Sequence, residues 1–324
     1  MSAETALKMT PEVLAEALGQ LDVGELRVRE PMREHTTMKV GGPADVFVVP
    51  SSREALKRAV RFAREHKVPW LALGNGSNLL VRDGGLDGIV FSLKGLDQLD
   101  ILDAEVGRVR ADAGVPMARL IRVGLEHSFE GVWHLGGIPG TVGGAVRMNA
   151  GTRYGELESV LENVEVMSAA GMVKTYARTD LEFAYRSCSL PKDKLILGAT
   201  LLLGKGEGES LRTKHREVMS YRSNTQPLTF PSVGSVFRNP PPNKNGEVMA
   251  AGKLLELSNL KGVRIRGAQI SEKHANWIVN VGNARCADVL ALVRLMKDKV
   301  KQEHGVVLEL EAKVVGREDP SDEA

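Results

Sequence analysis

The most informative stretch of this chain is HLGGIPGTVGGAVRMNAG, residues 134–151. It places glycines at positions 136, 137, 140, 143, 144 and 151, and the rest of the sequence has no run of comparable density. Glycine lacks a Cβ and tolerates positive φ, so it permits tight turns and exposes peptide N–H groups. Successive N–H groups turned toward one point form a nest that suits phosphate oxygens. The run therefore predicts a loop that a phosphate-bearing ligand approaches closely.

The chemistry of this loop narrows the ligand class. Residues 138–144, IPGTVGG, lack the lysine of a P-loop, which argues against a nucleoside triphosphate and favours a cofactor that carries a diphosphate. A second cluster, GNGSN at 74–78, follows a strand-like run at 70–73 and leads into another at 79–81. A Rossmann fingerprint would lead into a helix, so this cluster is a different kind of turn. Taken alone, each cluster is explained equally well by a tight turn in an α+β domain or by a ligand-binding loop. The presence of both clusters favours a bound ligand.

Further motifs in one order carry a family resemblance. They are TTMKVGGPA at 36–44, LGNGSNLL at 73–80, GIPGTVGG at 137–144, NAG at 149–151, YR at 185–186, the run 221–240, KHAN at 273–276 and LELE at 308–311. The set resembles the UDP-N-acetylenolpyruvoylglucosamine reductases (UDP-N-acetylmuramate dehydrogenases) and covers residues 36–316. Its first part is similar to flavin-binding domains of the vanillyl-alcohol-oxidase, or PCMH, type. With about ninety residues between the Tyr221 motif and Glu311, the chain resembles the shorter class, which lacks the tyrosine loop over the substrate.

The resemblance implies an α+β fold: a PCMH-type FAD-binding module of two subdomains, then a smaller α+β substrate-binding domain. We expect a helical extension at 1–30, the FAD-binding domain at 31–204 (subdomains 31–95 and 96–204), the substrate domain at 205–316 and a disordered tail at 317–324. The polar run GKGEGE at 204–209 is the clearest boundary. Apolar periodicity predicts helices at 52–66 and 287–304, and a helix that starts at Pro11. Strands are expected at 46–49, 70–73, 195–203 and 308–314.

Three catalytic residues are transferred from the family. The serine of Gly-Ser-x-Phe is the family's proton donor, which implies this role for Ser235, although without that context a serine here would be a turn-capping hydroxyl. The arginine of Tyr-Arg contacts the substrate carboxylate, which implies this role for Arg186 and suits guanidinium geometry. Alternation over 308–314 alone cannot separate Glu309 from Glu311. The family's second glutamate is catalytic, so the resemblance selects Glu311.

The remaining site residues are also assigned by resemblance. The two glycine clusters are expected to contact noncovalently bound FAD, largely through backbone N–H groups, with NADPH as co-substrate. The cofactor-binding candidates are Gly74, Asn75, Gly76, Ser77, Asn78, Gly137, Ile138, Gly140, Thr141, Gly143, Gly144 and Asn149. The substrate-binding candidates are Tyr185, Arg222, Gln226, Arg238, Asn239 and His274. Arg238 stands where the family often has lysine, which keeps the charge and changes the donor geometry. His274 alone is better explained by a structural hydrogen bond.

Bulk properties fit a cytoplasmic enzyme. The 324 residues carry 43 Lys and Arg against 41 Asp and Glu, so no overall field attracts nucleic acid or membranes. Cys188 and Cys286 lie far apart and form no metal-like pair, and no metal is expected. No apolar run reaches the roughly 20 residues that cross a bilayer, and the N-terminus lacks a signal-peptide pattern. We expect a cytoplasmic monomer, an oxidoreductase and flavoprotein that uses NADP in peptidoglycan synthesis, and hence in cell wall biogenesis, cell shape and cell division.

Two alternatives remain at this stage. Another FAD-linked oxidase or dehydrogenase of the same fold would need neither Arg186 nor Ser235. A non-catalytic regulator that binds flavin or a UDP-sugar would keep the loops but would not need the three catalytic side chains. His35, His127 and His134 could each anchor a flavin covalently, but the resembled family binds FAD noncovalently.

Overall fold

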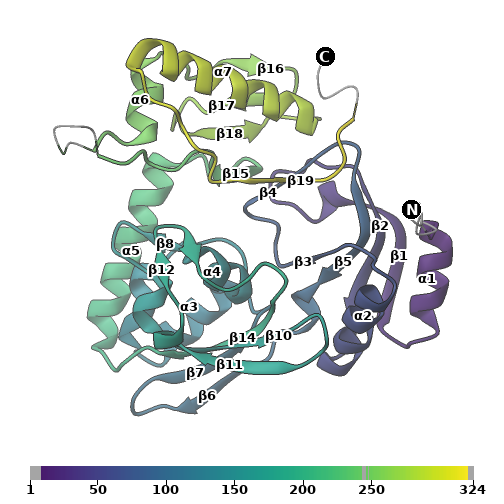
Figure 1. The fold of residues 1–324 in the computed structure, drawn as a ribbon. Helices are drawn as coiled ribbons and strands as arrows, with labels where there is room; N and C mark the ends of the chain where they lie inside the picture. The colour runs from purple at the N-terminus through teal and green to yellow at the C-terminus, as the bar shows by residue number, and fades with distance from the viewer. Residues whose placement is uncertain (1–8, 243–245, 247, 320–324) are drawn as a thin grey trace.

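The computed structural model describes residues 9–242, 246 and 248–319 and builds them around three sheets (Figure 1). The first sheet has the order β1-β2-β5-β3, with β1 antiparallel to β2 and the other neighbours parallel. Its strands are β1 (Gly24–Pro31), β2 (Pro43–Pro50), β3 (Trp70–Leu73) and β5 (Leu86–Ser92). Helix α2 (Arg53–Glu65) begins where the Ser52 hydroxyl accepts a hydrogen bond from the Ala55 N–H. The predicted helix at 52–66 is therefore confirmed to within a residue at each end.

The N-terminal segment is part of the first sheet's packing. Helix α1 (Pro11–Gly19) is capped by Thr10, whose side chain accepts a hydrogen bond from the Val13 N–H. The helix buries Leu14 and Leu18 in the main core. Strand β1 then forms an edge of the sheet, so the described part of the predicted extension is integral to the first subdomain. Residues 1–8 lie outside the described residues.

The second sheet is antiparallel throughout and has the order β11-β10-β14-β7-β6. Its strands are β6 (Leu99–Asp103), β7 (Arg108–Asp112), β10 (Leu161–Met167), β11 (Val173–Ala177) and β14 (Leu195–Leu202). Two helices belong to this unit, α3 (Met117–Glu126) and α4 (Val142–Met148). Two small hairpins project from it: β8 (Gly151–Thr152) with β9 (Gly155–Glu156), and β12 (Phe183–Ala184) with β13 (Ser187–Cys188). One continuous apolar core joins both subdomains.

The third sheet forms the upper part of the molecule in Figure 1 and has a separate core. It is antiparallel in the order β15-β18-β17-β16. The strands are β15 (Ser232–Ser235), β16 (Arg264–Ile265), β17 (Ala268–Ile270) and β18 (Trp277–Asn280). Helices α6 (Ala251–Leu257) and α7 (Cys286–His304) pack on it, and α7 ends at Gly305 with a left-handed φ of 67°. The predicted helix at 287–304 is confirmed.

Helix α5 (Gly208–Thr225) connects the lower and upper parts (Figure 1). It packs on α3 and on the 3-10 helix Glu130–Leu135 of the second subdomain. The preceding polar run is held in place, because the Lys205 ammonium donates to the carbonyls of Ala104 and His127. The domain boundary expected at residue 204 stays a prediction, and the third sheet itself begins at Ser232.

After α7 the chain returns to the first subdomain. Strand β19 (Lys313–Val315) pairs in parallel with β4 (Leu79–Val81), and both run between the upper and lower parts (Figure 1). The expected single strand at 308–314 is wrong in extent: only an isolated bridge between Leu310 and Phe237 precedes β19. Arg317 of the expected tail is anchored to Gly84, Asp45 and Asp87, and residues 320–324 lie outside the described residues.

Among the described helices, none combines the length and the apolar character that crossing a membrane would require.

Candidate active site

The two glycine clusters face each other across the junction of the first two subdomains. A Cβ built on Gly74 would lie 2.3 Å from the Thr141 Oγ1, and one on Gly140 would lie 2.7 Å from the Ser77 Oγ. Gly140 also has a φ of +99°, which disfavours any residue with a side chain. The loops can meet this closely only because both positions are glycine. The result is a cradle of backbone and two hydroxyl groups, which fits a diphosphate-bearing cofactor.

The glycines of this cradle have different roles. The Gly143 N–H donates to the Ala113 carbonyl, and a Cβ there would lie 2.7 Å from the Ala113 Cβ, so Gly143 lets α4 pack on the second sheet. Gly76 has a φ of +62° and passes over the backbone of His35 and Thr36, which belong to the TTMKVGGPA segment. Gly137 has a φ of +72°, and a Cβ there would lie 2.5 Å from the Arg222 Nε.

Arg186 and Glu311 are brought into direct contact. Arg186 lies in the tight turn between β12 and β13 with a left-handed φ of 57°. Its Nε donates to the Glu311 Oε1 at 2.9 Å, although the two residues are 125 positions apart. Its second terminal nitrogen, Nη2, donates to the Gly151 carbonyl at 3.0 Å. Both side chains are largely buried, with exposed fractions of 17% and 15%. The structure thus joins two of the three predicted catalytic side chains.

Burial affects the protonation of Glu311. It raises the pKa of Glu311 above its usual range, although the charges of Arg186 and Arg238 pull that pKa down. The desolvation of the carboxylate therefore outweighs the two cations. A carboxyl group in this setting can hold a proton and donate a hydrogen bond, whereas an ordinary surface glutamate would be ionised.

The segment that follows Ser235 is hydrogen-bonded to the backbone around Glu311. Ser235 ends β15, and Gly234 before it has a φ of +78°, so the predicted sharp bend is present. The Glu311 N–H donates to the Val236 carbonyl at 2.9 Å, and the Arg238 N–H donates to the Glu309 carbonyl at 2.9 Å. The residue that follows Ser235 is therefore bonded to the backbone of Glu311.

A supporting network holds Arg186 from the other side. Glu156 of β9 pairs with the Arg186 Nη1 at 3.4 Å and accepts from the Asn149 Nδ2 at 2.7 Å. Asn149 is fully buried, has a φ of +41° at the end of α4 and also accepts from the Glu158 N–H. The amide of Asn149 is therefore engaged with protein partners, and its proximity to a flavin ring stays a prediction.

The predicted substrate residues separate into two groups. Within the described part of the chain, Arg222 Nε, Gln226 Oε1 and Arg238 Nε are buried without a hydrogen-bond partner, so these three side chains retain bonding capacity. Asn239 and His274 instead bond to protein. The Asn239 Oδ1 accepts from the first N–H of α6, and the His274 Nδ1 accepts from the Asn276 N–H. Tyr185 is half exposed, with the Arg186 guanidinium 4.8 Å from its ring centre.

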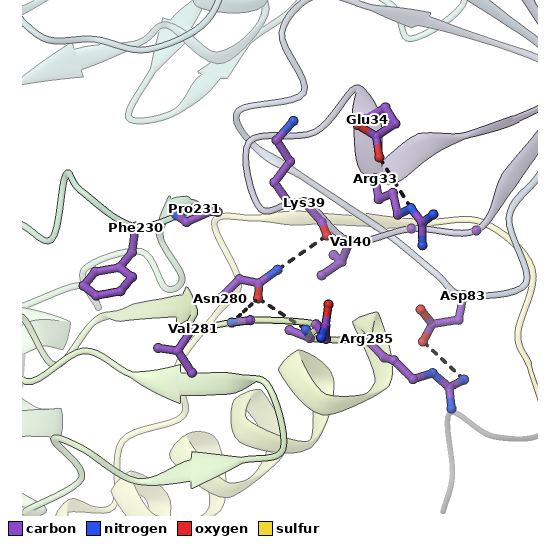
Figure 2. Close-up of a pocket in the computed structure, with 15 residues that line it drawn as sticks. Arg33, Glu34, Lys39, Val40, Asp83, Phe230, Pro231, Asn280, Val281 and Arg285 are labelled. Carbon is purple, nitrogen blue, oxygen red and sulfur yellow. Dashed lines mark hydrogen bonds and ion pairs between the residues drawn. The ribbon is translucent and has the colours of Figure 1, made fainter.

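A cavity of about 850 Å³ lies at another part of the domain junction (Figure 2). Lys39, Phe230 and Asn280 are among its lining residues, and Asp83 pairs there with Arg285. Arg186, Ser235 and Glu311 do not line it. The candidate site is therefore the junction around Arg186 and Glu311 and not this cavity.

Further contacts tie the segments of this network together. The Asn78 Nδ2 donates to the Glu311 carbonyl at 3.1 Å, and the Asn78 carbonyl accepts from the Lys313 N–H, so the first glycine loop is tied to the segment of Glu311. Sequence reasoning missed two residues here: Glu156, which pairs with Arg186, and Asn276, which bonds to Phe237 in the segment after Ser235. Periodicity gives no signal for such contacts; Asn276 stood inside a quoted motif, but only its histidine was selected.

Comparisons with known proteins match both halves of the chain. A family described as FAD binding domain matches residues 44–176, and one described as UDP-N-acetylenolpyruvoylglucosamine reductase, C-terminal domain, matches residues 226–315. A UDP-N-acetylenolpyruvoylglucosamine reductase of Anoxybacillus flavithermus is 41% identical over 94% of this chain and 99% of its own length. One of Syntrophus aciditrophicus is 42% identical over 91% of this chain and 93% of its own length. A crystal structure of the reductase from Thermus caldophilus matches with a TM-score of 0.73 and 37% identity, over 90% of this chain and 98% of that one.

Proposed function

The chain belongs to the UDP-N-acetylenolpyruvoylglucosamine reductase family, and from this premise we propose that Arg186, Glu311 and Ser235 carry its reductive step. The protein is an FAD-dependent oxidoreductase that uses NADPH to reduce UDP-N-acetylglucosamine enolpyruvate to UDP-N-acetylmuramate in peptidoglycan synthesis. The observation that carries the assignment of residues is the 2.9 Å bond between Arg186 and a glutamate whose pKa burial raises.

The chemical problem is an electron-rich double bond. The ether oxygen of the enolpyruvyl group donates electrons into that double bond. The bond therefore resists hydride addition unless the carboxylate of the same group withdraws electron density from it. The chemistry that bound FAD supplies is the transfer of a hydride from NADPH to C3 of this group. The protein has to stabilise the negative charge that then develops on the carboxylate oxygens and supply a proton at C2.

Arg186 and Glu311 meet the first requirement. A guanidinium binds a carboxylate through parallel N–H donors, and a protonated Glu311 donates a further hydrogen bond to the same developing charge. The network of Glu156 and Gly151 fixes Arg186 before substrate arrives, so little reorganisation is needed during the reaction.

Ser235 meets the second requirement by protonating C2, which gives the lactyl ether. A serine hydroxyl is a weak acid, so it must receive a replacement proton from solvent or from a neighbouring group. The backbone bonds that join the segment after Ser235 to the segment of Glu311 support this role, because they connect the donor to the charge-stabilising pair.

The cofactor and the substrate are assigned to the remaining candidates. The cradle formed by Gly74, Ser77, Gly140 and Thr141 would hold the diphosphate of noncovalently bound FAD. The unpartnered buried atoms of Arg222, Gln226 and Arg238 would bind the anionic UDP-sugar. Asn239 and His274 would contribute to substrate binding indirectly, because their hydrogen bonds hold the surrounding loops in place.

We also propose that the protein works in the cytoplasm as a monomer, and that through its product it affects cell wall biogenesis, cell shape and cell division. UDP-activated sugars and NADPH are cytoplasmic metabolites. The near balance of 43 basic and 41 acidic residues supports the absence of a nucleic-acid or membrane partner.

The test is to follow the two half-reactions of Ser235→Ala separately by the absorbance of the flavin. NADPH should reduce the variant's flavin at nearly the parent rate, whereas the enolpyruvyl substrate should reoxidise it about 100- to 1000-fold more slowly, the usual cost of one preorganised group. Reoxidation at the parent rate would exclude Ser235 as the donor.

A further inference from the structure

Asn276 forms an unusual set of bonds with the segment that follows Ser235. Its side-chain Oδ1 accepts from the Phe237 N–H at 3.0 Å, and its Nδ2 donates to the Phe237 carbonyl at 2.8 Å. Its own carbonyl accepts from the Val236 N–H at 2.9 Å. Asn276 is buried, with an exposed fraction of 4%. One residue thus makes three hydrogen bonds to two consecutive residues next to the proposed proton donor.

These bonds continue a sheet where its strand has ended. The last paired positions of β15 and β18 are Ser235 and Trp277, and the pairing before them is irregular. Before Trp277 the chain turns away, because the Trp277 N–H donates to the His274 carbonyl. On the β18 side, Phe237 therefore has no strand residue paired with it among the described residues; its bridge to Leu310 is on the other side. The Asn276 amide presents one acceptor and one donor on the β18 side, as a backbone would.

The other side of the same segment is bonded to Glu311. The Val236 carbonyl accepts from the Glu311 N–H, and the Arg238 N–H donates to the Glu309 carbonyl. The segment 236–238 therefore lies between Asn276 and the segment that carries Glu311. A shift of this segment would move both Ser235 and Glu311 relative to the reacting carbons.

We propose that Asn276 is a positioning residue whose amide acts as a substitute strand and fixes Ser235 and Glu311 in register for proton delivery and charge stabilisation. The inference rests on the proposed function of these two residues. Misplacement of a reacting group by about 1 Å can cost about 100-fold in rate, so even a small relaxation of segment 236–238 should be measurable.

Asn280 provides a matched control. It lies four residues further along the chain, at the end of β18, is buried to a similar degree at 8% exposed, and its side-chain amide also bonds to backbone groups. Its Nδ2 donates to the Met38 carbonyl. Figure 2 shows its further bonds, from Nδ2 to the Lys39 carbonyl and to Oδ1 from the N–H groups of Gly282 and Ala284. Replacing it removes an equivalent structural amide and leaves the segment 236–238 untouched.

The experiment compares Asn276→Ala with Asn280→Ala in the flavin-loaded protein. Both should be destabilised, by a similar shift of the urea midpoint. Only Asn276→Ala should slow reoxidation by the enolpyruvyl substrate, by about 10- to 100-fold, with an increased solvent deuterium isotope effect because protonation becomes slower. Reduction by NADPH should stay near the parent rate in both variants. Hydrogen exchange should accelerate at the Phe237 amide only in Asn276→Ala, a readout that needs no catalysis.

A second substitution keeps the test decisive if Asn276→Ala folds poorly. In Asn276→Asp a protonated carboxyl can both donate and accept, as the amide does, whereas an ionised one cannot donate to the Phe237 carbonyl. The reoxidation rate relative to the parent should therefore fall as the pH rises. The charged and titratable side chains near this segment are the same in both proteins, so their effects cancel in the ratio; they are His274, Arg238, Glu309 and Glu311. Asn280→Asp should show no such pH-dependent ratio.

Two results would overturn the proposal: equal slowing by Asn276→Ala and Asn280→Ala, or a constant rate ratio for Asn276→Asp across the pH range. Failure of the proposed function would look different, because the parent protein itself would then not be reoxidised by the enolpyruvyl substrate.

Discussion

At the scale of single residues, Glu311 shows how burial and charge compete. Arg186 lies 2.9 Å away, and Arg238 also acts on the carboxylate, yet burial raises the pKa of Glu311. A surface glutamate beside two arginines would ionise readily. Here the effect of desolvation on the pKa outweighs that of both cations, so the carboxyl group next to the Arg186 guanidinium holds its proton more readily. That combination suits a site where negative charge develops during the reaction.

This leads to a pH prediction for Glu311→Gln. Since the pKa of Glu311 is raised, the parent should lose its hydrogen-bond donor as the pH rises through that value, and reoxidation by substrate should slow. Glutamine stays neutral, so the variant should react more slowly overall and should lose this pH-dependent decrease. Stopped-flow reoxidation of both proteins across the pH range measures it. If the variant retains the decrease, another group causes it.

The stability of the same variant has a defined sign. A raised pKa means that the folded protein holds the Glu311 proton more tightly than the unfolded chain does. This contribution is fully present below the ordinary value of 4.5 and is lost as the pH rises through the raised value. Glu311→Gln should therefore gain stability relative to the parent at high pH, as measured by urea unfolding at two pH values.

Sequence could not have distinguished these side chains without the resemblance. Glu309 and Glu311 occupy equivalent positions of one alternating pattern. The structure separates them through a contact with Arg186, which lies 125 residues away. Contacts at such sequence separation depend on how the domains meet, and local periodicity carries no information about that. The same reason explains why Glu156 and Asn276 were missed.

At the scale of elements, local signals predicted helices well. Ser52 before α2, Pro11 at the start of α1 and Gly305 after α7 stand at the expected positions. The segment 308–314 was harder, because its residues pair with two different partners. Leu310 meets Phe237 of the substrate domain, and Lys313 meets Leu79 of the first subdomain. An alternating pattern predicts extended chain but cannot locate a change of partner.

The glycine loop permits a test with a matched control. Gly137 and Gly204 share a φ of +72°, but a Cβ on Gly137 would lie 2.5 Å from the Arg222 Nε, whereas a Cβ on Gly204 would meet no described atom within 4 Å. Alanine at either site costs about 1–2 kcal/mol of backbone strain. Only Gly137→Ala must also displace Arg222, so it alone should weaken substrate binding, measured by titration of the oxidised flavin spectrum. Equal binding by both variants would remove Arg222 from the site.

At the scale of the whole molecule, the site exists only where three units meet. Arg186 belongs to the second subdomain, Ser235 to the substrate domain, and Glu311 to the segment that returns to the first. Ion pairs join these units. Arg53 at the start of α2 bonds to Asp112 and Glu165 of the second sheet, and Asp83 accepts from the first N–H groups of α7. The division into these units stays a prediction from the sequence, and sequence patterns carry no signal for the contacts between them, since each contact links residues far apart in the chain.

Arg317 anchors the chain segment that follows α7 to the first subdomain. Its replacement tests whether this anchor affects stability and the position of Glu311. Arg317 lies two residues after β19, and its guanidinium bonds to Asp45, Asp87 and the Gly84 carbonyl. Arg317→Ala should lower the free energy of unfolding by about 1 kcal/mol, since these are charge-assisted bonds at a partly exposed site. It should also slow reoxidation by substrate more than reduction by NADPH, because β19 holds the segment that carries Glu311.

The control for this anchor is Arg216→Ala on α5. Arg216 pairs with Glu209 at the surface, where the two side chains are 67% and 68% exposed, so its loss should change stability by less than about 0.5 kcal/mol. Urea unfolding and the two flavin half-reactions measure both variants. If Arg317→Ala unfolds earlier but reoxidises at the parent rate, the β4–β19 pairing alone positions Glu311. If the half-reactions slow equally, the anchor supports the whole cradle, and Glu311 has no special dependence on it.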